Sequence, residues 1–385
     1  MNQLLNNDVN SDEPADKPKI LLASSLHRWN DVRIFHKEAC SLAVKYDVTV
    51  MGVASQSISN SGEIRILTFP RPTSLVRRFL NGYKILEEGV SGGYAIFHFH
   101  DPELLWVGFI LKLFRNKVVY DVHENTYNAI QIRTWLPKNL RKVLGKLTHC
   151  FELFGQWCFD GIILAEDSYV KNFSESDNIT VIRNYVRIGP KPLAINRGSK
   201  RILYTGAITL ARGLGDFLEA LGLLQAEEKN ISATIVGQLD NRDIDKLHEL
   251  KSNLSQPENV EILPHVDFSE LKYFANKCEL AVVPLRDKQN YLYSVPTKIL
   301  DYMNWGIPYV YSRLPLSYEL FGENSGGVSY EPGNFSDLAE KIRYLLNDQM
   351  VYLTKSKQGR DKIVFFNWEK EQAKLLVLYE KIIEN

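Results

Sequence analysis

Short apolar runs alternate with amphipathic stretches along almost the whole chain. In the first half, the runs read KILLASS, YDVTVMGV, IRILTF, AIFHFH, KVVYDVH, GIILAE and TVIRN. Turn residues bound these runs and helical patterns separate them, as expected for buried parallel strands joined by crossover helices. The pattern therefore predicts an α/β, doubly wound, Rossmann-like domain over residues 19–190.

A stretch rich in Gly, Pro and Lys, VRIGPKPLAINRGSK, interrupts the pattern and is typical of a linker. A second series follows: RILYTGAI, SATIVGQL, VEILPHV, LAVVPL, IPYVYS and GVSYEP. It predicts a second Rossmann-like domain over residues 191–365, which faces the first across a cleft lined by strand ends. Residues 366–385 read as an amphipathic helix that packs back on the first domain, and the polar residues 1–18 as a flexible tail.

Composition limits the class of protein. A chain of 385 residues fits two such domains. Lys plus Arg and Asp plus Glu both number 46, and this balance argues against a nucleic-acid partner. The four cysteines are scattered, and no stretch approaches the roughly 20 apolar residues of a membrane span. We expect a cytoplasmic protein, at most peripheral on the inner face of the cell membrane.

The first predicted strand runs into SSLHRWNDVRIFHKEA, where a dehydrogenase would carry a Gly-rich phosphate loop. No G-x-G-x-x-G is present, which weighs against a nicotinamide enzyme. Asn30, Asp31 and Arg33 instead precede a helix. They are candidates for the acceptor side of a site, or Asp31 and Arg33 order the loop through an ion pair.

The run AIFHFH ends in a group of polar side chains. Strand alternation places His98 and His100 on one face, and Pro102 ends the strand, so His100 and Asp101 lie at its tip. We predict a catalytic role for His100 and Asp101. The alternative is that they are satisfied structural groups.

The next run ends similarly, in His123 and Glu124, which we assign to the acceptor side. Histidine with carboxylate is also a metal-ligand combination. Because the helical spacing H-E-x-x-H is absent, we predict no bound metal.

In the second half, Gly206 ends a strand, and Arg212 and Gly213 lie in a Gly-rich turn before a helix. Such a turn exposes backbone N–H groups to an anion, and Arg212 adds a positive charge. Ordinary turn chemistry is the alternative for the glycines alone. Gly237 allows close backbone approach, and Gly237 and Val266 complete this donor-binding edge.

The stretch NYLYSVPTKILDYMNWGIPYVYS predicts a helix that starts near Pro296. Lys298 then lies in the first turn, where the helix dipole disfavours a cation unless a phosphate compensates. Asp301 follows three residues later on roughly the same face, where its carboxylate suits ribose hydroxyls. Arg212 and Lys298 are accordingly the predicted cations of a diphosphate site.

Three segments resemble glycosyltransferase family 4, retaining enzymes of the GT-B fold: NDVRIFHKEACSLA, HFHDPELLWVGFILK followed by VVYDVHEN, and SVPTKILDYMNWGIPYV. The last is similar to the P-x-K-x-x-x-Y-M branch. The resemblance implies sugar transfer from a nucleotide diphosphate donor. Because no D-x-D at a suitable strand end indicates a metal-bridged donor, we expect neither a metal nor a cofactor. A saccharide or polyprenol-linked acceptor in cell-surface polysaccharide assembly is the expectation if the two basic and apolar segments described below dock on a membrane.

The resemblance also implies roles. His100 would lie against the transferred sugar, Arg212 would contact the diphosphate, and Asp301 matches the second acid of an E-x7-E motif that binds ribose. Backbone groups of Ser294 and Val295 would meet the phosphates or the sugar.

Two positions depart from the family pattern. Tyr293 stands where the first Glu of the motif is expected, and Ala207 where an arginine is expected, a charge that Lys298 replaces. These departures favour one alternative, a non-catalytic nucleotide-sugar-binding scaffold. A nucleotide-sugar 2-epimerase, which shares the two-domain fold, is the other alternative.

Two further segments, RTWLPKNLRKVLGKLTHCFELF and SLVRRFLNGYKIL, combine basic and apolar residues at helical spacing. This combination suits an anionic membrane surface, although solvated helices of a domain surface show it too.

Overall fold

The computed structural model describes residues 17–131, 137–189, 191–193 and 197–385. Residues 1–16 of the predicted tail and parts of the predicted linker lie outside the described residues. The chain divides into two compact units: one extends to Val122 and adds residues 151–163 and 376–385, and the other holds residues 123–150 and 164–375. The domain boundaries expected from the sequence, after residues 18, 190 and 365, stay predictions.

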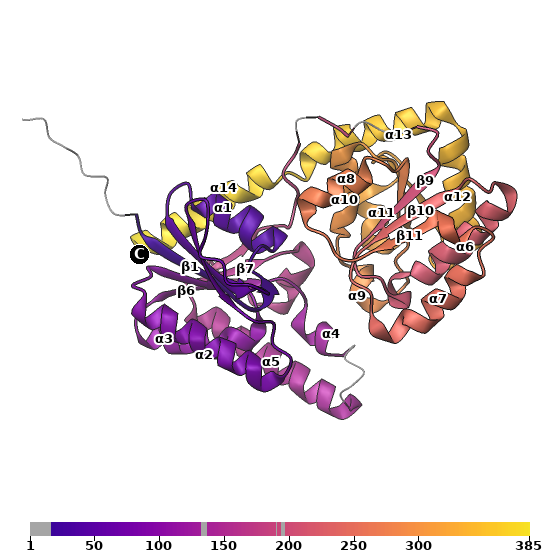
Figure 1. Cartoon of the computed structure of the whole chain (residues 1–385). Helices are drawn as coiled ribbons and strands as arrows, with labels where there is room; N and C mark the ends of the chain where they lie inside the picture. The colour runs from indigo at the N-terminus through magenta and orange to yellow at the C-terminus, as the bar shows by residue number, and fades with distance from the viewer. Residues whose placement is uncertain (1–16, 132–136, 190, 194–196) are drawn as a thin grey trace, which may run out of the picture. The chain divides into compact units, whose positions relative to one another are not determined.

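The first sheet has the spatial order β3-β4-β2-β1-β5-β6-β7-β8 (Figure 1). Its strands are β1 Lys19–Arg28, β2 Asp47–Val53, β3 Asn60–Ser61, β4 Ile64–Phe69, β5 Ile96–Phe99, β6 Lys117–Val122, β7 Gly161–Leu164 and β8 Ile179–Val181. All seven runs expected as strands are strands; the short β3, antiparallel to β4, was not expected. Because β1 pairs in parallel with β2 on one side and β5 on the other, the strand order reverses at β1, as in Rossmann folds.

The second sheet has the order β11-β10-β9-β12-β13-β14, and its neighbouring strands are parallel. Its strands are β9 Arg201–Thr205, β10 Ser232–Val236, β11 Val260–Leu263, β12 Leu280–Val283, β13 Tyr309–Ser312 and β14 Gly327–Tyr330. They coincide with the six expected runs. This order is that of the dinucleotide-binding fold, and it reverses between β9 and β12. Two Rossmann-like sheets are therefore confirmed.

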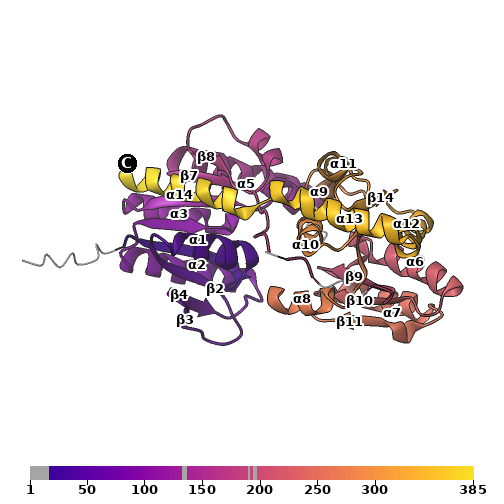
Figure 2. The same cartoon turned by 90° about the horizontal axis from the view of Figure 1, so that it is seen from above.

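Helices connect the strands of both sheets (Figure 2). Before β9 they are a π-helical segment Val32–Ala39, α1 Cys40–Leu42, α2 Leu75–Ser91, α3 Leu105–Leu113, α4 Thr126–Gln131, α5 Lys138–Cys158, and the 3-10 segments Pro102–Leu104 and Asp167–Asn172. After β9 they are α6 Leu214–Glu227, α7 Ile244–Ser252, α8 Phe268–Ala275, α9 Gln289–Leu292, α10 Thr297–Trp305, α11 Pro315–Phe321, α12 Phe335–Asn347, α13 Gln349–Lys362 and α14 Trp368–Glu384. Short 3-10 turns lie at Leu210–Arg212, Asn241–Asp243, Pro257–Asn259 and Ile363–Phe365. Within the described ranges, no helix combines the length and apolar character needed to cross a membrane.

Core packing orients α10, the helix predicted to carry Lys298. Ile299, Tyr302 and Met303 are fully buried in the apolar cluster on one face of the second sheet. With 3.6 residues per turn, burial of this face leaves Lys298 and Asp301, both only partly buried, at the margin of the core. The sequence of α10 thus presents a cation and a carboxylate beside the strand ends.

Candidate functional site

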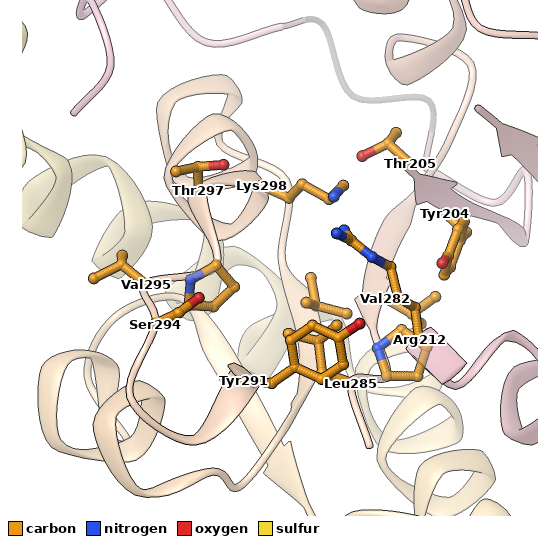
Figure 3. A pocket seen from close by; sticks show the side chains of 13 residues that line it. Tyr204, Thr205, Arg212, Val282, Leu285, Tyr291, Ser294, Val295, Thr297 and Lys298 are labelled. Carbon is orange, nitrogen blue, oxygen red and sulfur yellow. The ribbon is translucent and has the colours of Figure 1, made fainter. Parts of the chain in front are cut away.

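The first pocket lies where the strand order of the second sheet reverses. Its volume is about 210 Å³, and Tyr204 and Thr205 of β9 and Val282 and Val283 of β12 form part of its wall (Figure 3). The remaining wall is Arg212, Pro284, Leu285, Tyr291 and residues 294–298. Open α/β sheets bind ligands in this crevice beyond the carboxyl ends of their strands.

Two cations approach each other in this pocket. Lys298 projects from the first turn of α10 and Arg212 from the turn before α6, and Figure 3 shows their nitrogens converging on one space. Burial, reinforced by the positive charge of Arg212, lowers the pKa of Lys298 to about 8, while Asp301 acts in the opposite direction. Two cations beside a helix N-terminus favour an anionic ligand.

Three glycines allow the backbone segments around Lys298 and Arg212 to approach one another closely. Gly206 has φ 117°, and a Cβ built on it would lie 2.3 Å from Nζ of Lys298. A Cβ on Gly213 (φ 76°) would collide with the carbonyl oxygen of Pro284, and one on Gly237 with that of Gly206, each at 1.6 Å. The predicted glycines therefore serve close backbone approach, which brings Lys298 against the end of β9.

A second pocket, of about 350 Å³, adjoins the first through Arg212, Tyr291 and Ser294, which line both. Its other lining residues are His123, Glu124, Asn125, Asn128, Glu166, Ser168, Tyr169, Lys171 and Tyr293. Tyr291 lies 5.7 Å from the Arg212 guanidinium, measured to the ring centroid, and Tyr293 lies 5.4 Å from the Lys171 ammonium. The predicted residues His123, Glu124, Tyr293 and Ser294 are thus brought together.

Glu166, at the end of β7, is a pocket residue that the sequence analysis did not select. Its Oε1 accepts a hydrogen bond from the Val295 N–H at 3.2 Å, and its Oε2 accepts one from the Ser168 hydroxyl at 3.4 Å. Burial raises the pKa of Glu166 to about 7. Its position after the run GIILA was the available signal, because polar residues at strand ends line such sites.

His100 and Asp101 are buried at the tip of β5 and are not among the residues that line the two pockets described above, so their catalytic role stays a prediction. The Asp101 carboxylate accepts hydrogen bonds from the Ser24 hydroxyl at 2.7 Å and the Ser25 N–H at 2.6 Å. His100 Nδ1 lies 3.5 Å from an oxygen of Asp121. Asp101 therefore connects the middle of β1, at Ser24 and Ser25, to the tip of β5.

Asp31 and Arg33 order the loop after β1, each through its own partners. The Asp31 carboxylate caps the π-helical segment by accepting from the N–H groups of Arg33 and Ile34, at 2.8 and 3.1 Å. Arg33 is buried, with Nε 2.8 Å from Asp121 and 3.0 Å from Glu38. Asn30 lies half-buried in the preceding turn. The ion partners of Arg33 are therefore Asp121 and Glu38, and an acceptor-side role of Asn30, Asp31 and Arg33 stays a prediction.

Glu38, His98, His100 and Asp121 form a buried cluster whose potential ligand atoms lie within 4.8 Å of one another. Such side chains are zinc-ligand types. The Arg33 guanidinium already contacts both carboxylates, so it supplies the positive charge there. Burial, reinforced by Asp121, raises the pKa of Glu38. The absence of a bound metal stays a prediction.

Two predicted donor-side residues, Asp301 and Val266, are not among the residues that form the wall of the first pocket. Asp301 is partly buried one turn after Thr297 and acts electrostatically on Lys298. Val266 packs against the apolar cluster under α10. Ribose and base contacts of these two residues stay predictions.

The family comparison matches the part of the chain that carries the first pocket. Residues 188–362 match the model described as "Glycosyl transferases group 1". This range contains the whole second sheet, Arg212 and Lys298. The part of the chain that carries the first pocket is therefore similar to a glycosyl transferases group 1 domain.

The two curated relatives described here share a quarter of their aligned residues with this chain. The chain is 25% identical over 226 residues to an uncharacterised glycosyltransferase of Methanocaldococcus jannaschii, covering 57% of this chain and 59% of that protein. It is 25% identical over 197 residues to a glycogen synthase of Mycobacterium tuberculosis, covering 50% of this chain and 45% of that protein. The chain thus spans about half the length of the curated relatives it matches.

Solved structures share the fold over nearly the full length. Sucrose-phosphate synthase from Thermosynechococcus elongatus has a TM-score of 0.73 at 18% identity, covering 96% of this chain and 100% of that chain. Anabaena HepE in complex with UDP-glucose has a TM-score of 0.71 at 14% identity, covering 94% and 99%. The GT-B fold with its two Rossmann-like sheets is confirmed.

Proposed function

We propose that this protein is a glycosyltransferase that moves a sugar from a nucleotide diphosphate donor to a saccharide or lipid-linked acceptor in cell-surface polysaccharide assembly. The convergence of Lys298 and Arg212 at the strand switch point of a glycosyl transferases group 1 domain carries the proposal. Cleavage of the donor's glycosidic bond leaves a diphosphate with increased negative charge. Fixed cations and the N-terminus of α10 stabilise that charge.

The finer proposal is a retaining, metal-independent reaction of glycosyltransferase family 4. Two side-chain cations can take the part that a divalent ion plays for other diphosphate leaving groups. The similarity to HepE, a protein solved with UDP-glucose, supports a nucleotide-sugar donor for this chain. Retention of configuration rests on the family resemblance alone.

We further propose that α5 docks on the anionic inner face of the cell membrane. Seven of its apolar side chains are exposed: Leu140, Val143, Leu144, Leu147, Phe151, Phe154 and Trp157. Their spacing of three to four residues forms one stripe, and Lys138, Lys142 and Lys146 flank it at intervals of four. In a flotation experiment, the wild-type protein should rise with anionic vesicles, whereas the Phe151→Glu variant should stay behind unbound. Equal recovery of both from the vesicle fraction contradicts docking through α5.

A thermal-shift panel tests the donor site with UDP, GDP, CMP, ADP, dTDP and their common sugar conjugates, with and without EDTA. A ligand that binds only the folded state stabilises it by about 2.7 kcal/mol at a hundredfold excess over its dissociation constant. We expect one nucleotide family to raise the melting temperature regardless of EDTA. No shift with any compound overturns the proposal.

A transfer assay with the stabilising donor separates glycosyl transfer from other activities. We expect sugar to appear on a saccharide or lipid-linked acceptor with release of nucleotide diphosphate. Conversion of the donor sugar without any acceptor identifies an epimerase. Binding without hydrolysis or transfer identifies a scaffold.

A further inference from the structure

Glu166 places a carboxylate in the wall of the second pocket, beside the residues that lead into α10. We propose that Glu166 is a specificity-determining residue whose carboxylate binds hydroxyl groups of the transferred sugar. This inference rests on the proposed glycosyltransferase function and names a residue that selects the donor sugar.

One contact from a distant part of the sequence and one local contact hold Glu166 in place. It follows β7, and the Val295 N–H that donates to its Oε1 is 129 residues away. The Ser168 hydroxyl, at 3.4 Å, donates to Oε2. Both oxygens are thus oriented before a ligand arrives, which reduces the entropy cost of binding.

The same contacts leave capacity for a ligand. A carboxylate has roughly four lone-pair sites, and these two hydrogen bonds use one on each oxygen. Two neighbouring sugar hydroxyls can therefore donate to Glu166, one to each oxygen. Hydrogen bonds to a charged acceptor are the stronger class and discriminate well between hydroxyl arrangements.

The chemistry of the pocket around Glu166 suits a monosaccharide. Asn125 and Asn128 offer amide donors and acceptors, while Tyr291 and Tyr293 offer ring faces. The volume, about 350 Å³, lies within the range of roughly 300–1,000 Å³ found for small-molecule pockets. A sugar ring combines closely spaced hydroxyl groups with apolar C–H faces. The amides can therefore bind its hydroxyl groups, and the tyrosine rings can pack against its C–H faces.

Continuity of the two pockets points to the donor sugar rather than the acceptor. Arg212 lines both pockets, and Lys298 lies in the first. A diphosphate held by these cations carries its sugar on the outer phosphate. Ser294, the residue directly before Val295, lines both pockets and marks the way from the first to the second. The second pocket is therefore where the glycosyl group of a bound donor reaches Glu166.

Positively charged side chains in the second pocket balance the negative charge of Glu166, so it can lie near a bound diphosphate. Lys171 and Arg212 line the same pocket as Glu166 and Glu124, so the pocket carries two potential cations for two carboxyl groups. Glu166 can then contact uncharged hydroxyls without an uncompensated negative charge beside the phosphates.

Calorimetric titration at pH 8 tests the role, with UDP against UDP-glucose and GDP against GDP-mannose as probe pairs. In Glu166→Gln and Glu166→Ala we expect affinity for the parent nucleotide diphosphate to stay within twofold of wild type. Affinity for the sugar nucleotide should fall about tenfold or more, because the variants lose charge-assisted hydrogen bonds to the sugar hydroxyls. Glu175→Gln removes an exposed carboxylate outside the described pockets and should match wild type in both titrations.

An unchanged ratio of the two affinities in both Glu166 variants overturns the inference while leaving the proposed function intact. An equal loss for parent nucleotide and sugar nucleotide also overturns it, because Glu166 would then act through the fold. If the wild-type protein binds neither pair, the donor-site proposal fails, and this inference fails with it. Steady-state kinetics should agree, with a raised KM for the donor in Glu166→Gln.

Discussion

The amine of Lys298 lies against the backbone of Gly206, so closely that a Cβ on this glycine would come within 2.3 Å of Nζ. The two residues come from different elements, Gly206 from the end of β9 and Lys298 from the first turn of α10. The absence of a side chain at Gly206 therefore sets how near the cation can approach the strand switch point. Lys298 and Arg212 line one pocket as a result.

We expect Gly206→Ala to weaken nucleotide diphosphate binding by at least tenfold, because the new methyl group displaces the Lys298 ammonium. The φ of 117° adds backbone strain for alanine. Calorimetric titration with the parent nucleotide diphosphate measures the loss. Gly333→Ala is the matched control, since its φ is also positive, at 81°, but no atom lies within 4 Å of its Cβ position. Equal losses in the two variants would show that displacement of Lys298 is not the cause.

Donor binding should be coupled to proton uptake near pH 8. Burial and Arg212 lower the pKa of Lys298 to about 8 in the ligand-free protein. A bound diphosphate favours the charged amine and raises that pKa, so affinity should increase as pH falls from 9 to 7. Titrations in buffers of different ionisation enthalpy report the protons taken up.

The control for this coupling is Lys298→Arg, because a guanidinium stays charged over the whole range. Its diphosphate affinity should show a weaker pH dependence, with less proton uptake. Uptake equal to that of the wild type in Lys298→Arg would assign the proton to another group.

Replacing Arg212 by alanine should lower kcat for sugar transfer by about 10²–10³, the range found for loss of one preorganised group that stabilises transition-state charge. Arg212 lines both pockets, so under the proposed function its charge would lie beside the leaving diphosphate. Arg242→Ala removes an exposed guanidinium that pairs with Asp240, and its kcat should stay near that of wild type. A normal rate in Arg212→Ala would remove Arg212 from the site.

Most of the fold could be predicted from local pattern. Buried parallel strands have continuous apolar stretches, and each run such as RILYT or LAVV was long enough to stand out. The two-residue strand β3 is too short to show periodicity, and a single antiparallel pairing with β4 creates it. The start of α10 was predictable because Pro296 and the apolar positions Ile299 and Met303 mark it.

Residues of the candidate site could be predicted where the signal lies within one short segment of sequence. Arg212 and Lys298 each follow from a turn or helix start beside a strand end. Glu166 was missed because its significance depends on Val295, which only folding brings near. Alternation placed His98 and His100 on one face but could not reveal that this face packs on buried groups, including the Tyr379 hydroxyl, 2.7 Å from His98 Nδ1.

Glu166 should also make stability depend on pH. In the folded protein burial raises its pKa from the ordinary 4.5 to about 7. Between these values the folded state holds the proton more firmly than the unfolded state, so this contribution to stability is lost as pH rises from 4.5 to 7. Charged groups near Glu166 are Asp167 on its own segment, Lys171, Arg212 and Glu124 around the second pocket, and Arg183, which lines a third pocket with Glu166.

Glu166→Gln removes the titration, so it should melt at a higher temperature than wild type at pH 8, with a smaller difference at pH 5. Thermal unfolding followed by circular dichroism at both pH values measures this, with Glu175→Gln as the control for loss of a surface carboxylate. A variant that is more stable at pH 8, and yet binds the sugar nucleotide less tightly, separates recognition by Glu166 from support of the fold. A destabilised Glu166→Gln at pH 8 would instead show that its hydrogen bonds to Val295 and Ser168 outweigh the cost of burying its charge.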